Sequence, residues 1–120
     1  MEQPPETERL LSRFRELQEY VAWTSDDAQS VAVAAPLVRP RLPLLVEDFY
    51  AEIERHPAAS KVITGGTAQV ERLKGTLIRW LEDALAGVYD AAYVQRRWRV
   101  GYRHVEIGLD QVYTNMALSR

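Results

Sequence analysis

The apolar residues of this 120-residue chain recur every three or four positions, which is the period of an α-helix. Residues 6–22, for example, place Leu10, Phe14 and Leu17 on one side of a charged helix. No segment shows the strict alternation that is typical of a β-strand. The same period predicts helices over residues 6–22, 26–38, 41–55, 67–86, 91–106 and 111–120. The pattern therefore predicts an all-α domain.

Residues with known preferences for helix ends mark the boundaries of these helices. The run at 24–27, Thr-Ser-Asp-Asp, consists of residues that cap helix N-termini. Pro36 predicts a kink or an early end in the second helix, whereas Pro43 fits the opening of the third. Gly87 is expected to end the helix over 67–86, and Asp90 to cap the helix that follows.

Composition and charge exclude several classes of protein. Lys and Arg number 15 and Asp and Glu 17, a net charge of −2, so no overall field attracts nucleic acid or an anionic membrane. The chain has no cysteine, which excludes a disulfide framework, a thiolate metal site and a cysteine nucleophile. With 2 histidines, a multi-histidine metal site is excluded as well. No apolar run approaches the roughly 20 residues of a membrane span, and the acidic start is unlike a signal peptide, so we expect a cytoplasmic protein.

No arrangement of residues is typical of a catalytic site. The glycine pair at 65–66 is interpreted as a loop break, because no phosphate-binding pattern surrounds it. No strand-to-helix turn presents a serine to His56 or His104. The acidic pairs at 26–27 and 47–48 are adjacent in sequence, and adjacent residues on a helix diverge. We therefore expect no catalytic residue in this chain.

Four arginines form a basic stripe on the helix over 91–106, at positions 96, 97, 99 and 103. The stripe has three interpretations: a solvated helix face, a nucleic-acid surface, or partners for the carboxylates of an anionic cofactor. The acidity of the whole chain favours the solvated face.

Histidine and tyrosine side chains on apolar helix faces are the remaining candidates. His104 shares a face with Val100 and Ile107, where a histidine is either a hydrogen-bonded core residue or a ligand. Tyr50 has the same two interpretations, a core residue or a functional one. His56 precedes a proline and is interpreted as a helix-end residue.

Several segments together resemble the globin domain of bacterial globin-coupled sensors, and most closely the versions attached to a histidine kinase. The resemblance begins near Tyr20, and the segments that carry it are VEDFYAEIERHP (46–57), QVERLKGTLIRWL (69–81), GVYDAAY (87–93) and RVGYRHVEIGLDQVY (99–113). The helix over 6–22 fits the extra N-terminal helix of such domains. The later predicted helices correspond to the family's A (26–38), B (41–55), E (67–86) and F (91–106) helices and to the start of G (111–120).

The resemblance implies a haem b cofactor. His104 matches the proximal histidine, the axial ligand of the iron. Tyr50 matches the distal tyrosine, whose hydroxyl can donate a charge-assisted hydrogen bond to bound O2. The other positions that the resemblance places beside the haem are Leu73, Thr76, Leu77 and Tyr113. The Thr76 hydroxyl has an alternative role, a bond back to the carbonyl of Arg72.

The resemblance also implies the function. We expect an oxygen-sensing globin domain that spans residues 1–120 and is the input module of a bacterial signalling protein. The histidine kinase output lies outside this chain, which is therefore not itself an enzyme. The expected ligand is O2, with CO and NO as alternative gases, and no nucleic-acid or membrane partner is expected. The family pattern continues through G and H helices that form a dimer interface, so we expect a domain incomplete at its C-terminus and a homodimeric full-length protein.

Two other functions are compatible with these helices. A haem-free globin-like module could bind a partner protein, although such modules usually lack the proximal histidine that His104 matches. A haem enzyme, such as a nitric oxide dioxygenase or a peroxidase, would need a reductase domain or reductant that the sequence does not show.

Overall fold

The computed structural model describes residues 7–119, and within that part of the chain the regular elements are all helical. The helices are α1 (Thr7–Tyr20), α2 (Ser25–Val38), α3 (Leu42–Glu54), α4 (Pro57–Ser60), α5 (Gly66–Leu85), α6 (Ala91–Glu106) and α7 (Gln111–Ser119), and a 3-10 turn, η1 (Arg39–Arg41), joins α2 to α3. The all-α prediction is confirmed. The helix ends lie close to the predicted ones, and the predicted ends at residues 6 and 120 lie outside the described residues.

Capping interactions explain where these helices begin. The Thr24 hydroxyl accepts a hydrogen bond from the Asp27 N–H at 3.4 Å, and the Asp27 carboxylate accepts one from the Thr24 N–H at 2.8 Å. This reciprocal pair starts α2. The Asp90 carboxylate accepts a hydrogen bond from the Tyr93 N–H at 3.0 Å and caps α6 as predicted. Pro43 lies in the first turn of α3, also as predicted.

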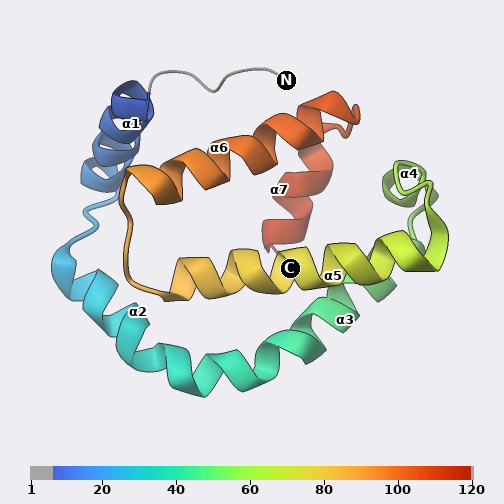
Figure 1. Cartoon of the computed structure of the whole chain (residues 1–120), viewed down its shortest axis with the longest axis horizontal. Helices are drawn as coiled ribbons and strands as arrows, with labels where there is room; N and C mark the ends of the chain where they lie inside the picture. Colours follow the sequence, from blue (N-terminus) through green and yellow to red (C-terminus); the bar gives the residue numbers. More distant parts are fainter. Residues whose placement is uncertain (1–6, 120) are drawn as a thin grey trace.

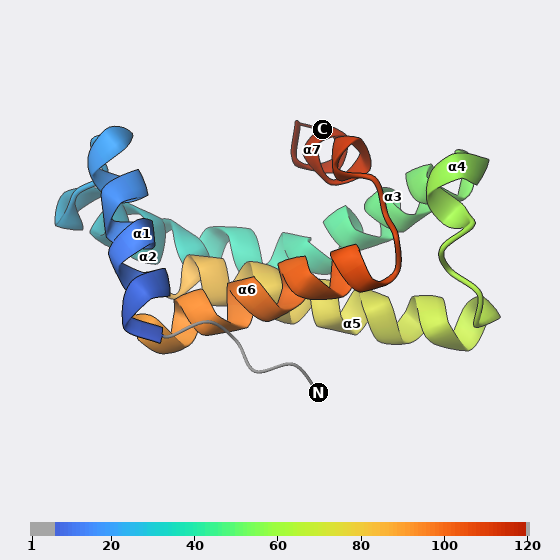
Figure 2. The same cartoon turned by 90° about the horizontal axis from the view of Figure 1, so that it is seen from above.

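The helices α5 and α6 run antiparallel through the middle of the molecule (Figure 1). The segments α2, η1 and α3 form an arc along one side of α5, and α3 packs closely on α5. The first helix crosses the beginning of α6 and packs on it, as the view from above also shows (Figure 2). The last helix turns back from the end of α6 (Figure 1), and the view from above shows that it stands apart from α5 (Figure 2). In this arrangement α1 supports α6, and α2 and α3 support α5.

The fully buried core is small. Among the described residues it comprises Ala35, Leu42, Val46, Tyr93 and Val94. Tyr93 also lies in a cluster of rings, because its centroid is 5.8 Å from that of Phe14 on α1 and 5.0 Å from that of Tyr89. Large apolar side chains on α2 and α3 remain exposed, Leu37 to 79% and Leu44 to 68%. Burial therefore fixes α1 on α6 and α3 on α5, and it leaves the outer face of the arc uncovered.

We expect Gly87→Ala to destabilise the fold, because Gly87 ends α5 in a backbone conformation that favours glycine. Its φ is +80°, and a Cβ atom there would lie 3.2 Å from the Cβ of Ala32. Alanine in the left-handed region costs about 1–2 kcal/mol, and the free energy of unfolding in urea should fall by that amount. The control is Gly101→Ala within α6, where a Cβ atom meets nothing within 4 Å. That change should stabilise the protein by about 0.5–1 kcal/mol, and equal stability of the two variants would contradict the prediction.

Candidate functional site

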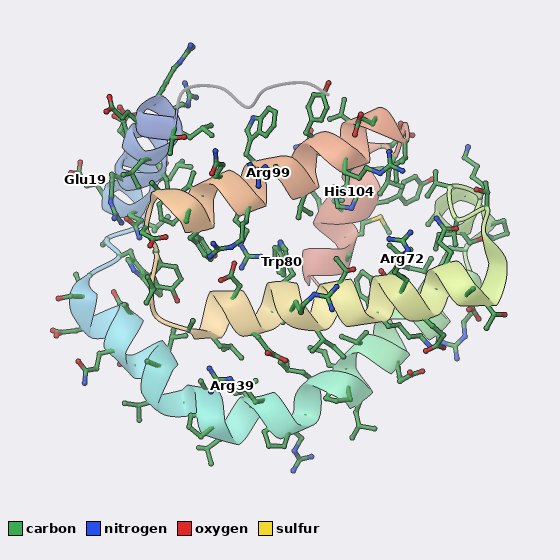
Figure 3. All side chains as sticks on the ribbon, viewed as in Figure 1. Glu19, Arg39, Arg72, Trp80, Arg99 and His104 are labelled. Atoms are coloured by element: carbon green, nitrogen blue, oxygen red, sulfur yellow. The ribbon has the colours of Figure 1, made fainter. Side chains whose placement is uncertain are left out.

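A cleft with a volume of about 630 Å³ lies between α5 and α6. Its walls include Thr76, Trp80 and Asp83 from α5 and Arg96, Arg97 and Val100 from α6. Figure 3 shows Trp80 between these two helices and Arg39 of η1 directed towards α5. Of the site residues predicted from the sequence, Thr76 lines this cleft, whereas His104 and Tyr50 do not. A second cleft of about 390 Å³ lies where α3, α4 and α5 meet, and the predicted site residues do not line it.

His104 lies on α6, one helical turn beyond Val100, and is partly buried. Its side chain points to the side of α6 on which α5 lies (Figure 3). Arg72 extends from α5 on the opposite side of the same space. The imidazole makes no hydrogen bond or ion pair with any residue that the structure describes. The buried, unpartnered side-chain atoms of the described residues do not include the ring nitrogens of His104, so these nitrogens are accessible to solvent or to a ligand.

Tyr50 lies on α3 and is partly buried. Its ring meets that of Phe49 edge-on, with centroids 5.2 Å apart. Burial raises the pKa of the Tyr50 phenol, and the nearby Arg72 guanidinium partly offsets this by favouring the phenolate. The hydroxyl is therefore protonated at neutral pH and can donate a hydrogen bond.

Thr76 lines the cleft, but its hydroxyl is engaged within its own helix. Its Oγ1 donates to the carbonyl oxygen of Arg72 at 3.1 Å and accepts a hydrogen bond from Arg79 Nη2 at 3.3 Å. The bond back to the Arg72 carbonyl is the alternative that the sequence left open. In this structure Thr76 therefore does not bond to the Tyr50 hydroxyl.

The other predicted site residues stand on separate elements. Leu73 and Leu77 are partly buried on α5, one turn apart, and Tyr113 is partly buried near the start of α7. In the described part of the chain, no hydrogen bond or ring contact joins His104 to Tyr50. The structure therefore places the candidates around α5 and α6 without direct bonds between the proposed proximal and distal residues.

The basic stripe divides into two parts. Arg99 and Arg103 are exposed, and Arg103 approaches Glu106 of the same helix at 3.7 Å. Arg96 instead makes two hydrogen bonds of 2.9 Å with the Asp83 carboxylate on α5. Arg96 is nevertheless exposed as well, so the solvated-face interpretation describes Arg96, Arg99 and Arg103 but not Arg97.

Arg97 is one of the four arginines of the stripe, and the sequence did not distinguish it from the other three. Its guanidinium lies over the ring of Trp80, 3.8 Å from the centroid, and 4.6 Å from that of Tyr93. Its Nη2 donates to the Trp80 carbonyl oxygen at 3.0 Å. The signal in the sequence was weak, because an arginine and a tryptophan on separate helices do not reveal which faces meet.

The chain offers few ligands to a free metal ion. Among the described residues, no group of three or more His, Asp or Glu side chains is placed to hold one. A single imidazole can still complete the coordination of a metal that a prosthetic group already holds. The same part of the chain contains no helix long and apolar enough to cross a membrane.

The helical architecture, with a cleft between two antiparallel central helices, defines a globin-like domain. The model of the Protoglobin family matches residues 10–120, and the chain belongs to this family. Family membership confirms the globin-like fold and the resemblance to globin domains, a class that binds small gas molecules. Attachment to a histidine kinase remains a prediction.

Proposed function

We propose that this domain binds haem b through His104 and acts as an oxygen sensor, the input module of a bacterial signal-transduction protein with a histidine kinase output. The observation that carries the proposal is the imidazole of His104, whose ring nitrogens are accessible and which points from α6 to the side where α5 lies. Membership of a globin family supports a haem as the group that this nitrogen binds.

The residues near the central helices fit such a group chemically. Leu73 and Leu77 supply partly buried apolar surface on α5, which disfavours water at the site. Tyr50 supplies a protonated hydroxyl on α3, which can stabilise a bound gas that carries partial negative charge. When bound, the haem supplies reversible binding of a diatomic gas at its ferrous iron.

Signalling requires that the gas-bound and gas-free domains differ in conformation. A ligand shifts an equilibrium only by its difference in affinity for the two states. His104 lies near the end of α6, and its carbonyl oxygen accepts a hydrogen bond from the Leu109 N–H at 3.1 Å in the segment that leads to α7. A displacement of His104 would therefore reach α7 directly. In this proposal the domain is not an enzyme, and the full-length protein is a homodimer.

The test is the absorption spectrum of the purified protein after haem addition, recorded oxidised, reduced with dithionite, and reduced then aired. We expect a Soret band that shifts on reduction and shifts again to a stable oxygenated form. A folded, helical protein without a Soret band would overturn the proposal. Rapid consumption of NO with an added electron donor would indicate a haem enzyme instead.

A second candidate function, the haem-free interaction module, is favoured by one observation. The exposed apolar side chains of Val33, Leu37 and Leu44 lie on α2 and α3, and such surfaces often bind other proteins. If the domain has this function, the haem-free protein binds its partner protein. His104→Ala then binds the partner with the affinity of the wild type.

A further inference from the structure

Arg97 is held in one orientation by contacts on several sides. The guanidinium lies over the rings of Trp80 and Tyr93, at 3.8 and 4.6 Å from their centroids. The hydrogen bond from Nη2 to the Trp80 carbonyl oxygen fixes its rotation. An arginine held in this way presents its remaining N–H groups in a defined direction.

One nitrogen of this guanidinium has no partner. Nη1 of Arg97 is inaccessible to solvent and makes no hydrogen bond with any residue that the structure describes. Leaving a buried charged donor without a partner is unfavourable, so such a group calls for an acceptor. The neighbouring Arg96 differs, because both of its hydrogen bonds are made by the Asp83 carboxylate.

The charge of the cleft favours an anion as that acceptor. The lining residues include the arginines at 39, 79, 96 and 97, but only two carboxylates, those of Glu82 and Asp83. The Asp83 carboxylate is already paired with Arg96. The cleft therefore carries an excess of positive charge in a chain whose net charge is −2.

The position of Arg97 relative to His104 points to a particular anion. Arg97 and His104 are seven positions apart, about two turns of α6, which places both on the same side of the helix and about 10 Å apart along its axis. Val100 lies between them and lines the cleft. A flat cofactor that is held at His104 and extends along α6 would therefore bring an anionic group at its edge towards Arg97.

We propose that Arg97 binds a haem propionate, with Nη1 donating a hydrogen bond to a carboxylate oxygen. The inference rests on the proposed binding of haem through His104. In this proposal the haem lies in the cleft between α5 and α6, and its carboxylates are directed towards Arg97.

The test compares haem with haem dimethyl ester, in which both carboxylates are esterified, by measuring the dissociation constant of each from the wild-type protein and from Arg97→Gln. The wild type should prefer haem over the ester by about 10-fold or more, as expected for a charge-assisted hydrogen bond. In Arg97→Gln this preference should largely disappear. The matched control is Arg99→Gln, on the exposed side of the same helix, which should keep the wild-type preference.

The comparison of the two cofactors separates propionate binding from a loss of packing. A general weakening of the cleft lowers the affinity for haem and for the ester alike and leaves their ratio unchanged, which would overturn the proposal. If Arg97→Gln does not fold, Arg97→Lys takes its place, because lysine retains the charge without the planar fork. The preference of Arg97→Lys for haem over the ester should be smaller than that of the wild type. A wild-type protein that binds neither cofactor would overturn the proposed function as well.

Arg97 could also bind a carboxylate of a free dicarboxylate, and we use succinate to test this. Succinate should leave the thermal unfolding of the haem-free wild-type protein unchanged. Stabilisation by succinate that is lost in Arg97→Gln would show a site for a free dicarboxylate and overturn the assignment to haem.

Discussion

Replacement of His104 by alanine is expected to abolish haem binding, so that the purified variant shows no Soret band and takes up no added haem. The imidazole is the protein's proposed bond to the iron, and the described residues offer no cluster of side chains that could hold the metal instead. The loss of affinity should exceed the ~10–100-fold that follows removal of a residue that merely supports a metal ligand. Haem titration followed by absorption measures it.

The second histidine of the chain provides a matched control. His56 lies before α4, its side chain is 60% exposed, and its Nε2 is 3.3 Å from Oε1 of Glu52. We expect His56→Ala to bind haem as the wild type does. Added imidazole should restore a Soret band to His104→Ala, because it can occupy the space left by the side chain. A normal spectrum in His104→Ala, or loss of haem in both variants, would refute the assignment.

The helix boundaries could be predicted because they depend on neighbours in the sequence. Thr24 and Asp27 cap α2 through bonds within a single turn, and Asp90 caps α6 in the same way. Gly87 adopts the positive φ that a glycine after a helix commonly takes. Such signals act locally, so they could be recognised without knowledge of the packing.

The contacts across the cleft could not be predicted in this way. Arg97 and Trp80 are 17 residues apart and lie on different helices, and their stacking depends on how α5 and α6 face each other. The sequence placed Arg96, Arg97, Arg99 and Arg103 in one stripe, whereas the structure turns the first two towards α5. Periodicity identifies the apolar face of a helix, but it does not identify the helix that packs beside a given polar residue.

The role of each candidate side chain also depends on its neighbours in space. Thr76 could bond to a ligand, to Tyr50 or to its own helix, and only the structure shows the bond to the Arg72 carbonyl. His104 could be a core residue or a ligand, and the structure shows that its ring nitrogens are accessible, as the nitrogen of a ligand must be. The resemblance to globin domains identified the positions, whereas the bonds that each side chain makes depend on packing that the sequence does not reveal.

Replacement of Tyr50 by phenylalanine is expected to leave haem binding intact and to release O2 about 10- to 150-fold faster. The change removes one hydroxyl, keeps the ring against Phe49, and deletes the hydrogen bond that the phenol donates to the gas. A hydrogen bond to a partly charged group is worth about 1.5–3 kcal/mol, which corresponds to that range of rates. Stopped-flow displacement of O2 by CO measures the rate. The control Tyr20→Phe, on α1 with a side chain 89% exposed, should release O2 at the wild-type rate.

The pH dependence of the same rate distinguishes a donor from a packing residue. Burial raises the pKa of the Tyr50 phenol, so the donor persists at neutral pH and is lost only when the pH rises above the usual range of a tyrosine. The wild-type rate of O2 release should therefore be constant through neutral pH and increase in strong alkali, whereas the rate of Tyr50→Phe should show no such increase. The release of CO should change little in either protein, because CO accepts a hydrogen bond weakly. If O2 leaves Tyr50→Phe as slowly as it leaves the wild type, Tyr50 serves only to pack against Phe49, and another group must stabilise the gas.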